Sequence, residues 1–186
     1  NSKATEVDDA TPIIELANND VLVGTLKGQL KLVTAFDTLT LNGAGIRKAY
    51  TFVKVYVGAL YTVKKSVSTD ELLNDPGDKL IRMTFVMKKV EKEKIVDAFS
   101  EGFSKNSAAV AGTADAKAFL SWFTADFVEG DTVDISLAAD GTLSATHNGK
   151  ALGTARNPAL ARAVLLIWFG EKPADGGLKK GMLGSG

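Results

Sequence analysis

Two dipeptides that favour tight turns constrain the fold of this chain more than any other feature of its sequence. Asp140-Gly141 and Asn148-Gly149 both suit the left-handed backbone that short β-hairpin loops require. They separate three short segments: 132–137, 142–146 and 150–154. The sequence therefore predicts a three-stranded antiparallel meander in this region.

Two helices are predicted before the meander. Ile95, Phe99 and Phe103 recur at four-residue spacing, which is typical of a helix with one apolar face. Thr113 is a suitable N-cap for a second helix, in which an apolar stripe is expected from Phe119, Phe123 and Phe127. Repeated aromatic residues also occur in cofactor sites, but we interpret this stripe as a helix face packed on a sheet, because Phe is usually buried.

Two further helices are predicted after the meander. Asn157-Pro158 combines an N-cap residue with a first-turn proline, and Gly170 stands where that helix should end. A last short helix is expected after Gly176-Gly177. Strands, two helices, a meander and two more helices describe an α+β domain with helices packed on an antiparallel sheet.

Arg47 is the leading candidate for a functional residue. It follows Gly43 and Gly45 and precedes a β-branched and aromatic run at residues 50–62. We expect the glycines to form a sharp turn that places Arg47 at the mouth of a strand. A guanidinium there matches the two oxygens of a carboxylate or the oxygen of a phenolate. The alternative is a surface arginine whose stem lies on apolar neighbours.

Residues 50–62 are predicted to form a strand with two different faces. Strict alternation places Lys54 and Tyr56 on one face, which mixes polar and aromatic groups as a ligand-lined surface would. The other face is almost wholly apolar and is expected to pack on a core. Lys54 and Tyr56 therefore join Arg47 as candidate ligand-binding residues.

The same stretch carries a family resemblance. Residues 43–47 (Gly-Ala-Gly-Ile-Arg), residues 54–61 (Lys-x-Tyr-x-Gly-Ala-Leu-Tyr) and the block at residues 163–184 are similar to the chalcone isomerase-like family, especially its bacterial members. These matches bracket most of the chain. The resemblance implies an open-faced β-sandwich in which a ligand cleft lies between the large sheet and the helices.

Several site positions follow from this resemblance. Arg47 matches the arginine that holds a phenolate in plant chalcone isomerases, and Tyr56 aligns with the threonine of the following strand. The catalytic tyrosine and asparagine of the helix fall near Glu91 and Ala98, and a polar residue of the C-terminal helix is replaced by Ile167. Because these polar groups are missing, we predict that efficient chalcone cyclisation is lost.

The remaining groups indicate a binding protein for a small anionic amphipath, fatty-acid-like or phenolic. Arg47 would pair with the head group, Tyr56 would donate a hydrogen bond, and Lys54 and Ile167 would also line the site. This inventory resembles that of the fatty-acid-binding members of the fold. The alternative is an isomerase (intramolecular lyase) acting on an unsaturated phenolic or enone substrate, with Arg47 and Tyr56 as catalytic residues. A haem-like planar ligand, or a structural protein with a filled cleft, stays open.

Composition limits the other classes of function. The chain has 22 basic and 22 acidic residues, so no basic footprint for nucleic acid is expected. It has no cysteine and a single histidine, His147, for which we expect a solvated position at a strand end. We therefore expect no metal and no cofactor, and no apolar run is long enough to span a membrane.

The N-terminal part of the chain is predicted to differ from the rest. Residues 1–18 are polar and expected to be irregular, whereas residues 19–186 are expected to form one domain. The chain starts at Asn1 rather than Met, and removal of an export signal, which bacterial relatives commonly carry, would explain this. We therefore expect a periplasmic or exported protein, with the cytoplasm as the alternative.

Overall fold

The computed structural model describes the backbone of residues 14–15, 20–24, 29–33, 35–36, 39–50 and 52–184, and the side chains of residues 39–50 and 52–184. Its strands are β1 (Ile14–Glu15), β2 (Asp20–Gly24), β3 (Gln29–Val33), β4 (Ala35–Phe36), β5 (Leu39–Ala49), β6 (Val53–Thr62), β7 (Lys79–Phe85), β8 (Lys89–Val90), β9 (Phe127–Val128), β10 (Thr132–Leu137), β11 (Thr142–His147) and β12 (Lys150–Arg156). Its helices are α1 (Thr69–Asn74), α2 (Lys92–Asn106), α3 (Ala114–Ser121), α4 (Pro158–Phe169) and α5 (Gly176–Met182).

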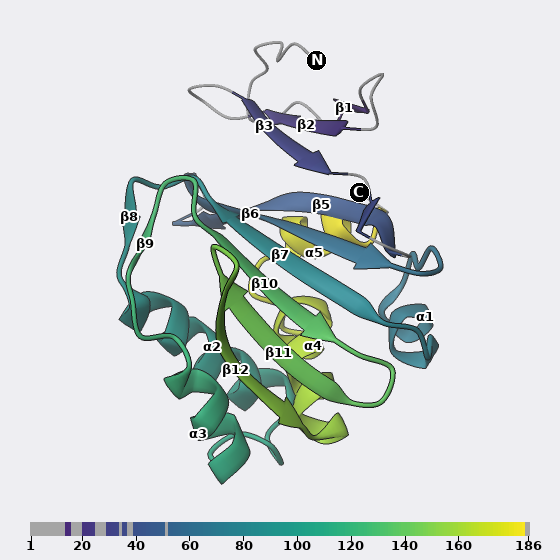
Figure 1. Ribbon diagram of the computed structural model, residues 1–186, viewed down its shortest axis with the longest axis vertical. Coiled ribbons are helices and arrows are strands. Elements are labelled where there is room, and N and C mark those ends of the chain that lie inside the picture. Colours follow the sequence, from purple (N-terminus) through teal and green to yellow (C-terminus); the bar gives the residue numbers. More distant parts are fainter. Residues whose placement is uncertain are drawn as a thin grey trace.

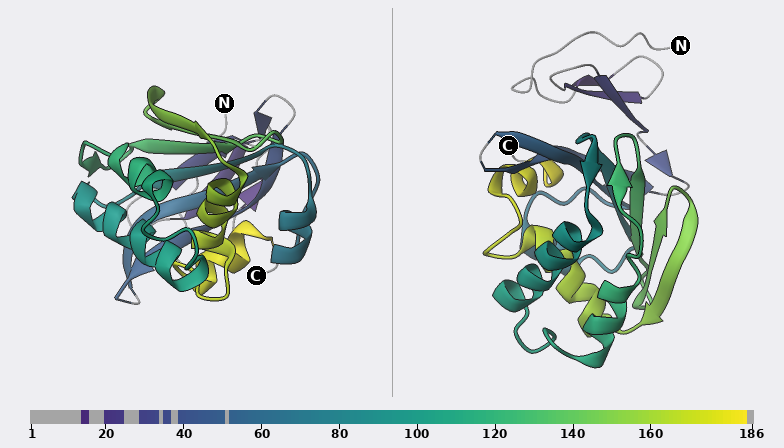
Figure 2. Two further views of the ribbon diagram at one scale, coloured as in Figure 1. Left: turned by 90° about the horizontal axis from the view of Figure 1, so that it is seen from below. Right: turned by 90° about the vertical axis from the view of Figure 1, so that its left-hand side faces the viewer.

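The architecture is the predicted α+β fold. Seven strands form an antiparallel sheet in the order β12-β11-β10-β7-β6-β5-β4, and helices α2 to α5 form a layer on one face of it (Figures 1 and 2). The main apolar core lies between this layer and the sheet and includes Leu60, Phe85, Phe99 and Trp168. Strands β1 to β3 form a separate small sheet on the far side of β5 from the helices (Figure 1).

The meander and the boundaries predicted for the helix that follows it are confirmed, whereas the last helix begins at Gly176 and not after Gly177. Strands β10, β11 and β12 are joined by tight connections, and Asn148 and Gly149 both adopt positive φ at the second one. Asn157 caps α4 by accepting a hydrogen bond from the Leu160 N–H, and Gly170 follows its last residue. Local turn and cap chemistry therefore sets these boundaries.

The expected glycine turn is wrong. Gly43 and Gly45 lie inside the long strand β5, and neither adopts positive φ. They are needed for a close approach instead, because a Cβ at Gly43 would lie 2.2 Å from the carbonyl oxygen of Gly181 in α5. At Gly181 in turn, a Cβ would lie 2.4 Å from the carbonyl oxygen of Ala44. The described turn residues come after Ala49 and are Tyr50 and Phe52.

The expected aromatic stripe on the second helix is only partly correct. Helix α3 ends at Ser121, so Phe123 follows the helix and Phe127 belongs to β9. Nevertheless Phe119, Phe123 and Phe127 are all buried in the main core. The rings of Phe119 and Phe123 pack edge to face at 5.4 Å, and the ring of Phe127 stacks on that of Phe85. The structural interpretation of these residues is therefore confirmed.

The predicted division at residue 18 stays a prediction, because most of residues 1–18 lie outside the described part of the chain. Strand β1 is the one element described there, and it pairs with β2. Among the described residues, no helix combines the length and apolar character that a membrane span requires.

Candidate functional site

Arg47 and Tyr56 are brought together by the pairing of β5 with β6. They are direct partners across the two antiparallel strands, so their side chains leave the sheet on the same face. Gly45 pairs with Gly58 two residues further along, on the same face, and this glycine pair lies under Leu178 of α5. The face that carries Arg47 and Tyr56 is therefore the one covered by the helices.

A β-bulge changes the expected position of Lys54. Arg47 pairs with Tyr56, but Lys48 pairs with Lys54, so Val55 is an extra residue on β6. Val55 and Tyr56 consequently both line the cavity described below, whereas Lys54 does not. The prediction that Lys54 lines the ligand site is therefore corrected. Strict alternation could not anticipate the change, since a bulge shifts the phase of a strand by one residue.

Asp175 forms an ion pair with the guanidinium of Arg47. One oxygen of Asp175 accepts a hydrogen bond from the Leu178 N–H at 3.0 Å, and the other accepts one from the Lys48 N–H at 3.0 Å. The distance from Arg47 Nη1 to the second oxygen is 3.9 Å, and Nη1 also donates to the Lys48 carbonyl. Because backbone donors already occupy Asp175, most N–H groups of Arg47 stay available to a ligand.

Tyr56 is held at a fixed orientation. Its hydroxyl oxygen accepts a hydrogen bond from Trp168 Nε1 at 3.0 Å, and both side chains are almost completely buried. Burial raises the pKa of Tyr56 to about 12, although the Trp168 hydrogen bond and the nearby charge of Arg47 oppose this rise. At neutral pH Tyr56 is therefore a proton-bearing hydrogen-bond donor and not a base.

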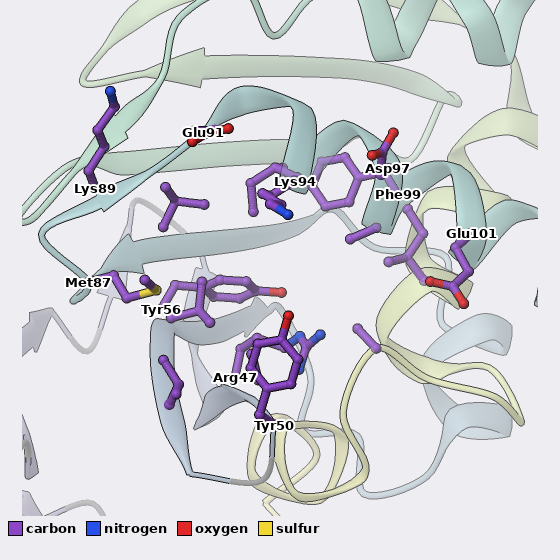
Figure 3. A pocket seen from close by; sticks show the side chains of 18 residues that line it. Arg47, Tyr50, Tyr56, Met87, Lys89, Glu91, Lys94, Asp97, Phe99 and Glu101 are labelled. Atoms are coloured by element: carbon purple, nitrogen blue, oxygen red, sulfur yellow. The ribbon is translucent and has the colours of Figure 1, made fainter.

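These residues line a cavity of about 640 Å³ between β5, β6 and α2 (Figure 3). That volume lies within the range of about 300–1,000 Å³ found for small-molecule sites. Its walls are mainly apolar and come from residues Ala49, Val53, Val55, Met87, Val90, Ile95, Ala98, Phe99, Ile167 and Ala174. Figure 3 shows the polar ends of Arg47, Tyr50 and Tyr56 turned toward the same part of this cavity.

Charged residues of both signs line the cavity along α2 and just before it. They are Lys89, Glu91, Lys94, Asp97 and Glu101. Lys105 lies 2.8 Å from Glu101, and their hydrogen bond lowers the pKa of this carboxyl group. A carboxylate with a lowered pKa is a poor proton acceptor, so Glu101 is a weak candidate for a general base.

Three of the four candidate site residues therefore line one cavity: Arg47, Tyr56 and Ile167. Glu91 and Ala98, the positions that the resemblance placed near catalytic residues, line it as well. Sequence reasoning missed Trp168 and Asp175, which support Tyr56 and Arg47 from distant parts of the chain. No local pattern marks them, because their partners are 112 residues away and 127 or more residues away respectively.

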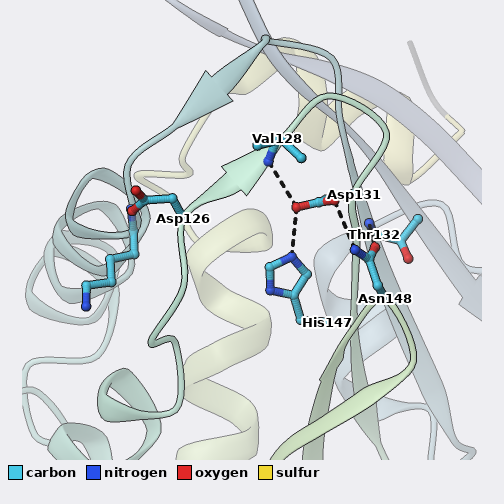
Figure 4. Close-up of polar contacts among 7 residues, drawn as sticks. Asp126, Val128, Asp131, Thr132, His147 and Asn148 are labelled. Atoms are coloured by element: carbon cyan, nitrogen blue, oxygen red, sulfur yellow. Dashed lines mark hydrogen bonds and ion pairs between the residues drawn. The ribbon is translucent and has the colours of Figure 1, made fainter.

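His147 does not belong to this cavity. Its Nε2 lies 2.9 Å from Asp131 Oδ2 (Figure 4). Its ring lies 5.0 Å from that of Phe127. Both side chains of the pair are 13% exposed, so the expected solvated position is wrong. The ring of Phe127 in β9 and the carboxylate of Asp131 cover the imidazole. Within the described residues, no group of three potential metal ligands is present.

Comparison with known proteins identifies the family. The model of the chalcone isomerase-like family matches residues 23–184, so the chain belongs to this family. The solved structure of a fatty-acid binding protein from Arabidopsis thaliana matches with a TM-score of 0.66 and 18% sequence identity, over 92% of this chain and 95% of that one. At this identity the likeness shows a common fold. No curated protein matches the sequence.

Proposed function

We propose that this member of the chalcone isomerase-like family binds a small anionic amphipath, such as a fatty acid, with its head group on Arg47. The main support for this proposal is that Arg47 and Tyr56, two hydrogen-bond donors, lie side by side at the wall of a cavity whose other walls are mainly apolar. A carboxylate can accept hydrogen bonds from both donors, while its hydrocarbon chain covers the apolar walls.

The environment of Arg47 supports this assignment. The side chain is 25% exposed and lines the cavity, which differs from a surface arginine surrounded by water. Asp175 limits where the guanidinium can lie, so little order must be gained on binding. The solved neighbour of the same fold is named as a fatty-acid binding protein, which supports the ligand class only as an analogy between folds.

Replacing Arg47 by Ala tests the proposal. We expect decanoate binding, measured by isothermal titration calorimetry, to weaken roughly ten- to a hundredfold, because a charge-assisted hydrogen bond is lost. Arg156→Ala is the matched control, since Arg156 lies on the far edge strand β12 and does not line the cavity. Equal affinity of Arg47→Ala and the parent protein would show that another group anchors the head group.

An isomerase acting on an unsaturated phenolic or enone substrate is the second candidate function. Arg47 and the neutral Tyr56 hydroxyl could stabilise negative charge that develops on a substrate oxygen. Incubation with chalcones and simpler enones tests this function. Conversion no faster than in buffer would exclude cyclisation of the plant type.

Periplasmic or exported localisation is a further proposal, motivated by the resemblance to bacterial relatives. Fractionation of the source cells followed by immunodetection tests it. Recovery with cytoplasmic marker proteins would contradict the proposal.

A further inference from the structure

Trp168 controls what the Tyr56 hydroxyl can do. The indole N–H has no acceptor function, so in the 3.0 Å contact between the two side chains the phenol oxygen must accept. Trp168 is 1% exposed and Tyr56 3% exposed, so water does not compete for this contact. The hydroxyl hydrogen of Tyr56 must therefore point in another direction.

The remaining direction leads to the cavity. Among the described side chains and backbone groups, none accepts a hydrogen bond from Tyr56, and its only polar contact is the one with Trp168. Tyr56 lines the cavity, and Figure 3 shows its hydroxyl turned toward Arg47. A buried hydroxyl without an acceptor is unfavourable, so a ligand that supplies one gains a hydrogen bond there.

We propose that Trp168 is a specificity-determining positioning residue, which turns the hydroxyl hydrogen of Tyr56 toward the cavity and so makes the head-group site select carboxylates over alcohols. The inference rests on the proposed function and deepens it. Arg47 can only donate hydrogen bonds. Because the oxygen of Tyr56 already accepts from Trp168, the Tyr56 hydroxyl also acts as a donor toward the ligand. A carboxylate accepts from both donors with its two oxygens and brings a negative charge to Arg47, whereas an alcohol offers one neutral oxygen.

The hydrogen bond from Trp168 also strengthens Tyr56 as a donor. It stabilises negative charge on the phenol oxygen and opposes the increase in the Tyr56 pKa that burial causes. Hydrogen bonds in a chain polarise one another, so the bond from Tyr56 to a ligand is stronger when Trp168 is present. Trp168 thus acts on the ligand through Tyr56 and without contacting it.

Trp168→Phe removes the N–H group and keeps an aromatic ring next to Phe99, whose ring lies 5.5 Å from that of Trp168. Calorimetry should compare decanoate with decanol, which have equal chain length and different head groups. In the parent protein we expect decanoate to bind about tenfold or more tightly than decanol. In Trp168→Phe we expect decanoate binding to weaken roughly three- to tenfold and decanol binding to stay unchanged or improve.

A double-mutant cycle separates this role from simple packing. In the Tyr56→Phe background, Trp168→Phe should leave decanoate affinity unchanged, because the hydroxyl that it positions is absent. Trp122→Phe is the control, since Trp122 packs on Phe119 and makes no contact with the Tyr56 hydroxyl. Thermal melting of each variant verifies that it is folded.

Two results would overturn the inference alone. One is an equal loss of decanoate and decanol affinity in Trp168→Phe, and the other is an undiminished effect of Trp168→Phe in the Tyr56→Phe background. Either would show that Trp168 only packs, while the proposed ligand class would stand. If the parent protein binds neither decanoate nor decanol, the proposed function fails and the inference fails with it.

Discussion

Arg47 and Tyr56 use different physical means to present a hydrogen-bond donor to the cavity. Arg47 is a cation by the chemistry of its guanidinium, which lies 3.9 Å from Asp175. Tyr56 keeps its proton because burial raises its pKa to about 12. At neutral pH this pair of residues therefore combines one cation with one neutral donor, and a carboxylate can accept hydrogen bonds from both.

Asp131 provides a residue-level test of electrostatic stability away from the cavity. Burial opposes its ionisation, but hydrogen bonds from Asn148, the Val128 N–H and His147 outweigh this effect and lower the pKa of Asp131 (Figure 4). A lowered folded-state pKa stabilises the fold above the unfolded-state value, and this contribution is lost as pH falls through the folded-state value.

We therefore expect Asp131→Asn to destabilise the protein near neutral pH by an amount that shrinks as pH falls below about 4. Both proteins in the comparison should carry His147→Gln, so that the imidazole does not titrate. Urea denaturation at several pH values measures the difference in the free energy of unfolding. A difference that stays constant down to pH of about 2 would contradict the expected role of Asp131 ionisation.

At the scale of elements, glycines on β5 and β6 decide how closely α5 approaches the sheet. A Cβ at Gly58 would lie 2.9 Å from a methyl group of Leu178, and one at Gly43 would meet only backbone atoms of α5 and the residues after it. A side chain can rotate away, but backbone atoms cannot. Gly43 therefore determines the position of α5, whose N-cap residue Asp175 holds Arg47.

Gly43→Ala should lower the free energy of unfolding by about 1–3 kcal/mol, because overpacking forces α5 away from the sheet. It should also weaken decanoate binding, since Asp175 moves with the helix. Chemical denaturation and calorimetry measure the two effects.

Gly176→Ala is the matched control for this substitution. A Cβ at Gly176 meets no atom within 4 Å, and the residue lies in the first turn of α5. We expect this change to stabilise the protein by about 0.4–1 kcal/mol, because Ala has less freedom in the unfolded chain. Similar destabilisation by both substitutions would argue against the close approach as the cause.

For the whole molecule, ligand binding and folding should be coupled. The cavity lies between the sheet and the helical layer, so a ligand in it contacts elements that separate on unfolding. At a free decanoate concentration of about one hundred times Kd, the expected stabilisation is about 2.7 kcal/mol. That corresponds to an increase in Tm of roughly 5–10 °C for a domain of this size.

Differential scanning fluorimetry measures this increase in Tm. Arg47→Ala should show a much smaller increase at the same decanoate concentration, because less of it is liganded. An equal increase in both proteins would indicate that decanoate stabilises the fold without using the proposed head-group site.

Most elements of the fold could be predicted from local sequence signals. The Asn148-Gly149 turn and the caps at Thr113 and Asn157 depend on residues a few positions apart, and the structure confirms them. Gly43 and Gly45 were misinterpreted because a glycine that permits a turn and a glycine that permits a close approach look the same in a sequence. The helix that distinguishes them lies more than 130 residues away along the chain.

The sequence by itself determined the α+β class, the meander, the capped helices and the candidacy of Arg47, Tyr56 and Ile167. Each depends on side-chain chemistry, short-range periodicity or a family motif. Only the tertiary structure decided that a bulge at Val55 removes Lys54 from the cavity and that Trp168 orients Tyr56. Strand register and contacts between distant elements arise when the sheet and helices pack, and packing is a property of the whole chain.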